Sequence, residues 1–232
     1  MLDFDGPICS VFSGLPASSV AAGLLDFLRR KAVQLSPAMM VEEDPLEVLR
    51  WTANHAPEHL SPIEDELCRA EEVAVQTAEP APGAATFIRE ATQHGWSVGV
   101  VSNNSARSVL AFLELQGLTA DVHAIVGRVH SRPDLMKPDP APVLRALIMA
   151  GHSAVASVLV GDSVTDVLAA NSAGVQAIGY ANRPEKWVGL VDAGAIVVIN
   201  KMDELAPALL AAAAGGSNGS EDAAAPGDGQ VP

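Results

Sequence analysis

The sequence predicts an α/β fold: a Rossmann-like parallel sheet core with helices on both faces and an inserted α-helical cap domain. Two observations lead to this prediction. From about residue 83 onward, short β-rich runs alternate with amphipathic helical segments, and continuous apolar strands of this kind belong to parallel sheets covered on both faces. Residues 14–79 do not follow this alternation and are typical of helices only.

The first strand is expected around Phe4, at the end of the opening segment MLDFDG. The cap should then contain three helices, at 17–34, 44–56 and 62–77. Pro45 suits the first turn of the second of these helices, where its missing N–H costs no hydrogen bond. Pro80 and Pro82 mark the return of the chain to the core.

The remaining strands are expected at Trp96–Val101, His123–Val126, Val155–Val160, Gln176–Tyr180 and Ala195–Ile199. The helices that accompany them are expected at 83–94, 105–116, 140–151, 164–173, 184–193 and 203–212. Glycines stand where five of these helices should end, at Gly95, Gly117, Gly151, Gly174 and Gly194. A glycine is favoured there because the chain leaves a helix through a left-handed conformation.

These patterns divide the chain into three parts: a core of residues 1–13 and 80–213, a helical cap of residues 14–79, and a disordered tail of residues 214–232. The tail is rich in Gly, Ala, Ser and Pro and lacks large apolar side chains, so burial cannot offset the entropy of ordering it. Only Met1 and Leu2 precede Asp3, which is a short beginning for a central strand. Two interpretations stay open: further strand residues precede Met1, which we slightly favour, or the fold tolerates a short first strand.

Composition excludes several classes of partner. The net charge of −14 argues against nucleic acid, because phosphate backbones are bound by patches of Lys and Arg. Cys9 and Cys68 are far apart, which predicts neither a disulfide framework nor a zinc site. No apolar run reaches the roughly 18 residues of a membrane span, and no signal peptide is evident. We expect a cytoplasmic protein, either a monomer or a homodimer, with a small-molecule substrate.

Polar side chains follow the predicted strands at the points where those strands end. Asp3 and Asp5 follow the first strand, Ser102 and Asn103 follow VGVV, and Asp162 follows VLVG. Asp166 lies one turn further along the next helix, and Lys137 lies in the loop SRPDLMKPDP. Ligands of open parallel sheets bind at the carboxyl ends of the strands, so we expect these side chains to meet at one edge.

Such a group of carboxylates indicates phosphoryl chemistry. Acids at close range repel one another, and a hard divalent cation such as Mg²⁺ removes the conflict while binding substrate phosphate. One aspartate can then attack phosphorus while the other moves a proton. Ser102 and Lys137 can bind the phosphoryl oxygens, although Ser102 is also suited to cap the helix at 105–116, and Asp166 could be an ordinary first-turn acid.

Four segments carry a resemblance to a known family. DFDG, VVSNNS, Lys137 before PDP, and GDSVTDVLAANSAG resemble, in this order, the four motifs of the haloacid dehalogenase-like superfamily, and the likeness covers about residues 1–213. The helical cap after the first strand resembles the subclass that contains phosphoglycolate phosphatase and β-phosphoglucomutase. Pro7 departs from the pattern, because the family often has threonine there.

The resemblance implies a Mg²⁺ cofactor and a role for each acid. Asp3 would be the nucleophile and a metal ligand, and Asp5 the acid/base, with its carbonyl also on the metal. Asp162 would bind the metal directly, while Asp166 would support the metal's waters or Lys137.

Ser102, Asn103 and Lys137 would bind the phosphoryl group. The expected function is a Mg²⁺-dependent phosphatase that hydrolyses a small phosphorylated metabolite through an aspartyl-phosphate on Asp3. Two alternatives stay open: a phosphosugar mutase like β-phosphoglucomutase, and a non-catalytic phosphate-binding module on the same fold.

Overall fold

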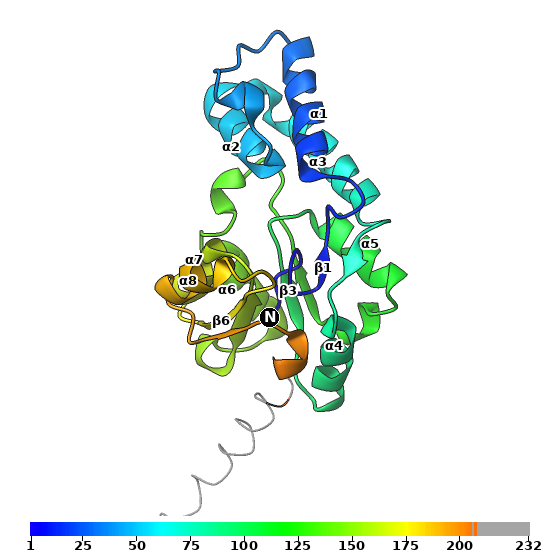
Figure 1. Cartoon of the computed structure of the whole chain (residues 1–232), viewed down its shortest axis with the longest axis vertical. Coiled ribbons are helices and arrows are strands. Elements are labelled where there is room, and N and C mark those ends of the chain that lie inside the picture. The colour runs from blue at the N-terminus through cyan, green and yellow to red at the C-terminus, as the bar shows by residue number, and fades with distance from the viewer. Residues whose placement is uncertain (206, 208–232) are drawn as a thin grey trace, which may run out of the picture.

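The computed structural model describes residues 1–205 and 207, and shows an α/β unit with a group of helices set apart at one end (Figure 1). The α/β unit contains the strands β3 (Gly99–Val101), β4 (Ala124–Val126), β5 (Val158–Gly161), β6 (Gln176–Tyr180) and β7 (Val197–Ile199). It also contains the helices α4 (Ala84–Gln93), α5 (Ala106–Leu115), α6 (Ala141–Ala150), α7 (Val164–Ser172) and α8 (Lys186–Asp192).

The opening segment lies at the centre of the sheet. β3 pairs with β4, and β5, β6 and β7 pair in that order, all in parallel. Leu2 forms parallel bridges to both Val100 of β3 and Val160 of β5. Residues 1–3 therefore join the two groups of strands, and the order across the sheet is β4, β3, residues 1–3, β5, β6, β7.

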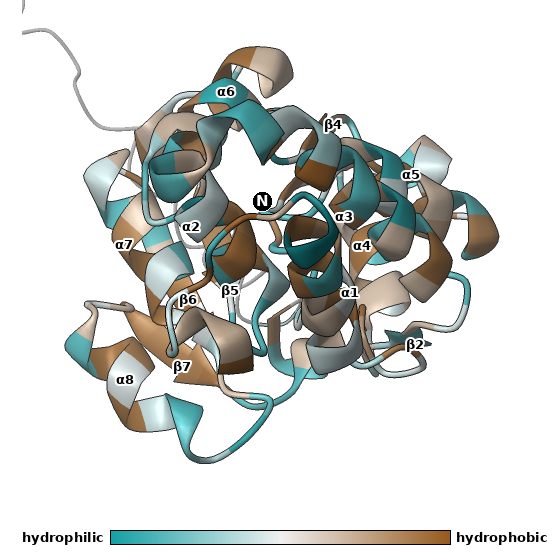
Figure 2. Ribbon diagram, turned by 90° about the horizontal axis from the view of Figure 1, so that it is seen from above, coloured by the Kyte–Doolittle hydropathy of each residue, from teal (hydrophilic) through white to brown (hydrophobic). Residues whose placement is uncertain are grey.

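Helices cover both faces of this sheet, as the sequence predicts. Successive strand residues point to opposite faces. Val100 accordingly belongs to the same buried cluster as Phe112 of α5, whereas its neighbour Val101 belongs to the cluster that contains Val143 of α6 and Leu190 of α8. Figure 2 shows α4 and α5 on one side of the molecule and α7 and α8 on the other. The prediction of a parallel sheet between two helical layers is confirmed.

The separate group consists of α1 (Ala17–Arg30), α2 (Pro45–His55) and α3 (Leu60–Ala74), which we call the cap helices. They share a core of their own, in which Leu28, Leu49 and Leu67 are fully buried. Asp44 caps α2 by accepting the N–H of Leu46, and Pro45 occupies the first turn as expected. Burial of these apolar stripes against one another stabilises the three helices as a unit.

Two short strands join the cap helices to the sheet. β1 (Cys9–Ser10) and β2 (Glu79–Pro80) form an antiparallel pair, so the chain leaves and re-enters the core through adjacent segments. Sequence reasoning did not predict this pair. Two residues on each side give too short a pattern to recognise, and their partners lie about 70 positions apart along the sequence.

Most predicted elements are present, with ends that differ by a few residues. β6 has the predicted bounds, whereas β5 begins at Val158, because Ala154–Ala156 forms a 3₁₀ turn instead of extended chain. The glycines at the five predicted helix ends all have positive φ. The helix expected at 203–212 and the tail expected at 214–232 lie largely or wholly outside the described residues. In the described part of the chain, no helix is both long and apolar enough to cross a membrane.

Candidate active site

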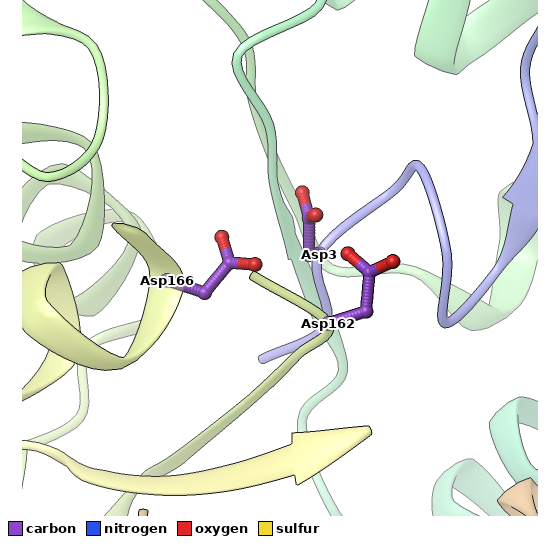
Figure 3. A group of neighbouring side chains, drawn as sticks. All are labelled: Asp3, Asp162 and Asp166. Atoms are coloured by element: carbon purple, nitrogen blue, oxygen red, sulfur yellow. The ribbon is translucent and has the colours of Figure 1, made fainter. Parts of the chain in front are cut away.

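The strand-end acids meet where the central strands finish. Asp3 ends the opening segment, Asp162 directly follows β5, and Asp166 lies in the first turn of α7. Figure 3 shows their three carboxylates gathered at one place. Each of the three offers an oxygen within 4.8 Å of the others, and all three side chains are buried.

Two glycines make this close approach of acids possible. Gly6 has a φ of 120°, and a Cβ at this position would lie 2.3 Å from Cγ of Asp162. A Cβ at Gly161 would lie 2.3 Å from Cβ of Asp166. Only glycine leaves room for a side chain at these distances, and a φ of this sign is unfavourable for other residues. The glycines in DFDG and VLVGD are therefore part of the site's construction.

The first turn of α7 orients Asp166. Ser163 caps the helix by accepting the Asp166 N–H at 3.2 Å, and Oδ2 of Asp166 accepts the N–H of Ser163 at 3.0 Å. This reciprocal capping box holds the carboxylate from one side. Asp166 is thus both a first-turn acid and a site residue, because its other oxygen faces Lys137.

Lys137 is the buried cation of the site. Its Nζ lies 2.6 Å from Oδ1 of Asp3 and 2.5 Å from Oδ1 of Asp166, and it donates to the carbonyl of Val101 at 3.1 Å. Burial by itself would lower the pKa of this ammonium, but the charges of Asp166 and Asp3 outweigh it and raise the pKa above its usual value. Lys137 therefore stays charged between the two acids.

Negative charge remains in excess around the three acids. Burial raises the pKa of Asp3, and the nearby Asp166 adds to the shift, while Lys137 opposes it. Burial likewise raises the pKa of Asp162, although Lys186 opposes that shift. Buried carboxylate oxygens with uncompensated charge are the donor set that suits a hard divalent cation. The residues present therefore fit Mg²⁺.

Two residues that follow β6 donate hydrogen bonds to the side chain of Asp162. Lys186 and Asn182 both donate to its Oδ2, which leaves Oδ1 available to a metal ion. Sequence reasoning did not identify Lys186 or Asn182 as site residues. Lys186 begins α8, and nothing in its local sequence shows that this end of the helix faces Asp162.

Asp5 lies beside these three acids, at the start of the turn toward the cap. Its Oδ1 accepts the N–H of Val11 at 3.0 Å, which fixes the side chain. Burial raises the pKa of Asp5, while the hydrogen bond from Val11 opposes the shift. A carboxyl in this environment holds its proton to a higher pH than usual, which suits an acid/base.

Ser102 and its neighbours follow β3. Ser102 is buried, and its Oγ accepts the N–H of Asn104 at 2.9 Å. Contrary to one interpretation of the sequence, Ser102 does not cap the next helix. Ser105 caps α5 instead, because it lies immediately before the first helical residue and its Oγ accepts the N–H of Ser108.

Both polar atoms of the Asn103 side chain bond to the backbone of Lys137. Its Oδ1 accepts the Lys137 N–H at 2.9 Å, and its Nδ2 donates to the Lys137 carbonyl at 3.3 Å. A phosphate contact from Asn103 would therefore come from its main chain while the side chain holds the loop in place.

A cavity of about 550 Å³ lies between these strand ends and the cap. On the core side it is lined by Asp3, Asp5, Ser102, Asn103, Asn104, Lys137, Asp162, Ser163, Thr165 and Asp166. On the cap side it is lined by Phe12, Ala17 and the loop from Glu42 to Leu46. Among the residues that the structure describes, Lys137 is the one basic side chain in this lining, whereas the cap loop adds three acids. Sequence reasoning missed this acidic wall, since nothing in the cap sequence shows which loop faces the core.

Known proteins match this chain in sequence and in fold. A family model described as haloacid dehalogenase-like hydrolase matches residues 25–180. A phosphoglycolate phosphatase of Mesorhizobium japonicum is 31% identical over 110 residues, which are 46% of this chain and 48% of that protein. The pyrophosphatase PpaX of Halalkalibacterium halodurans is 28% identical over 49% of this chain and 53% of its own length.

Among solved structures, a predicted phosphatase from Clostridium acetobutylicum has a TM-score of 0.72. It is 18% identical, and the match covers 90% of this chain and 96% of that one, which is a likeness of fold. The chain spans about half the length of the curated relatives it matches.

Proposed function

The chain belongs to the haloacid dehalogenase-like hydrolase family, and we propose that it is a Mg²⁺-dependent phosphatase that acts on a small phosphorylated metabolite through a phosphoryl group carried on Asp3. One observation carries the proposal: the buried Lys137 ammonium lies between Asp3 and Asp166, within a group of three convergent carboxylates. The names of the relatives, phosphoglycolate phosphatase and pyrophosphatase, support the same reaction class.

The acids divide between the metal and the reaction. Asp3, Asp162 and the main-chain carbonyl of Asp5 would hold Mg²⁺, with Asp166 supporting its waters and Lys137. When bound, the ion supplies positive charge that offsets the carboxylates and the oxygens of the transferring phosphoryl group. The raised pKa values of Asp3 and Asp162 support this assignment, because both reflect burial among like charges.

The reaction then proceeds in two displacements. In the first, an oxygen of Asp3 attacks phosphorus, the bond from phosphorus to the leaving oxygen breaks, and that oxygen takes a proton from Asp5. In the second, Asp5 takes a proton from water as the water attacks phosphorus. The bond to Asp3 breaks, and inorganic phosphate leaves. The raised pKa of Asp5 supports its role, because Asp5 must begin the cycle protonated.

Lys137, Ser102 and the main chain at Asn103 would bind the phosphoryl oxygens. Lys137 would neutralise the charge that builds on these oxygens, which is the contact most valuable in the transition state. Its place beside the nucleophile, 2.6 Å from Asp3 Oδ1, supports this role.

The test is hydrolysis of an aryl phosphate with Mg²⁺ by the wild type, Asp3→Asn and the control Asp26→Asn, an exposed acid of α1. Asp3→Asn should lower kcat/KM by at least about a thousandfold, while the control keeps its activity. Equal rates for the wild type and Asp3→Asn would refute the proposal.

Product analysis separates the alternatives. An isomeric sugar phosphate in place of free phosphate would identify a mutase. Binding of phosphate without turnover of any ester would identify a binding module.

A further inference from the structure

Three arginines of the cap helices each form an ion pair within their own helix. Arg29, Arg50 and Arg69 each form an ion pair with the acid three positions earlier in their own helix: Asp26, Glu47 and Glu66, respectively. Pairs of this spacing are common on exposed helix surfaces and stabilise a helix only weakly. Arg50 differs from the other two, because its side chain is 30% exposed, against 47% for Arg29 and 63% for Arg69.

The lower exposure of Arg50 goes with a second contact, which crosses from the cap to the core. Its Nη2 donates to the main-chain carbonyl of Lys137 at 3.0 Å. The same carbonyl accepts a hydrogen bond from Nδ2 of Asn103 at 3.3 Å. Helix α2 is thereby bonded to the residue whose ammonium lies between Asp3 and Asp166.

The backbone of Lys137 is therefore held from two directions. Asn103 binds both its N–H and its carbonyl from the core, and Arg50 binds the carbonyl from the cap. The ammonium of Lys137 lies beyond four rotatable bonds, so a shift of its backbone moves the charge relative to the nucleophile. A displacement of about 1 Å in such a group is enough to reduce catalysis strongly.

We propose that Arg50 is a positioning residue that couples docking of helix α2 to the placement of the phosphate-binding Lys137. The hydrogen bond forms only when α2 lies against the Lys137 loop. A cap displaced from the core leaves the lysine without this restraint, and a docked cap restores it. This inference rests on the proposed function, since it assumes that Lys137 binds the phosphoryl group.

The test uses inorganic phosphate as the probe, titrated calorimetrically into the full chain with Mg²⁺ present. Arg50→Gln should weaken phosphate binding about five- to tenfold, which is in the range of losing one intramolecular hydrogen bond. The matched control Arg69→Gln loses the same kind of helix pair and should stay within about twofold of wild type. Arg50→Lys, which keeps the charge and one donor, should recover part of the loss.

A double-variant cycle shows whether Arg50 acts through the lysine. In a Lys137→Met background, Arg50→Gln should have no further effect on phosphate affinity. A merely structural role would lower the melting temperature of Arg50→Gln and leave its phosphate affinity equal to that of Arg69→Gln, and this result would overturn the inference. If Arg50→Gln does not fold, the comparison of Arg50→Lys with Arg69→Gln decides in the same way.

Failure of the proposed function would look different. A wild type that binds phosphate but hydrolyses no ester refutes the phosphatase, while the Arg50 effect remains readable in the binding data. A wild type that binds no phosphate overturns both.

Discussion

Replacing Arg128 by methionine should lower the free energy of unfolding by about 3–5 kcal/mol. Arg128 follows β4 and is the main ionic link between the cap helices and the core, with its side chain wholly buried. Its Nε donates to Glu64 at 2.6 Å and its Nη1 to Glu71 at 2.7 Å, both on α3. Its Nη1 also donates to the carbonyl of Asn103 at 2.6 Å.

The magnitude follows from what the substitution leaves behind. Glu64 and Glu71 are buried, and Oε2 of Glu64 already has no hydrogen-bond partner among the described residues. Burial by itself would lower the pKa of Arg128, but Glu71 and Glu64 hold it above its usual value, so the guanidinium is charged throughout. Methionine would fill much of the volume but would leave two carboxylates without their cation. That outcome costs more than the lost hydrogen bonds alone.

The assay is urea unfolding of wild type, Arg128→Met and the control Arg132→Met. Arg132 is exposed and pairs only with Asp134 among the described residues, so its loss should leave the midpoint unchanged. Adding Glu64→Leu to Arg128→Met should restore part of the stability, because it removes one of the two unpaired carboxylates.

The stability deficit of Arg128→Met should also depend on pH. Without Arg128, a buried carboxylate binds a proton more tightly in the folded chain than in the unfolded one. The deficit of the variant should therefore shrink as the pH falls from about 8 to about 5. A loss below about 1 kcal/mol, or a deficit that does not change with pH, would refute the reasoning.

Three further predictions concern the candidate active site. Lys137→Met should lower kcat/KM for an aryl phosphate by about 10²–10³-fold, and a change within twofold would show that the ammonium does not contact the transferring group. Glu43→Lys places a cation in the acidic cap loop, so the ratio of kcat/KM for a carboxylate-bearing phosphate ester to that for a neutral one should rise about three- to tenfold at low salt. That gain should fade as salt is added, and a ratio that stays unchanged would exclude a role for the loop in selectivity. Gly6→Ala should weaken Mg²⁺ binding and lower the free energy of unfolding, because its Cβ collides with Asp162. In the control Gly23→Ala, the new Cβ meets no atom within 4 Å, so the change should be neutral or stabilising. Equal Mg²⁺ titrations for the two glycine variants would contradict this reading.

Much of the fold could be predicted because its signals are local. The alternation of apolar strands with amphipathic helices identified the parallel sheet, and the glycines with positive φ lie at the predicted helix ends. Strand lengths were less predictable. The strand expected from Val155 begins only at Val158, because Ala154–Ala156 forms a 3₁₀ turn.

The composition of the candidate site was also readable from the sequence. Asp3, Asp162 and Asp166 each occupy a motif at the end of a strand, and a parallel sheet brings such ends to one edge. The chain order of the motifs therefore predicts proximity without knowledge of any contact. Ser102 illustrates the limit, because its motif indicated both a cap and a phosphate ligand, and only the structure assigned the cap to Ser105.

The sequence by itself determined the order of the elements, the acids at the strand ends and the lysine that accompanies them. Only the tertiary structure decided how the cap meets the core. Arg50 and Arg69 have the same spacing to an acid in their own helices, but Arg50 alone also bonds to Lys137, 87 positions away. Arg128 finds its partner Glu71 57 positions away. The physical reason is that short sequence patterns locate the acids at the strand ends, and the geometry of a parallel sheet brings those ends together. A contact between the cap helices and the core depends instead on the angle at which the two parts pack, which no local pattern specifies.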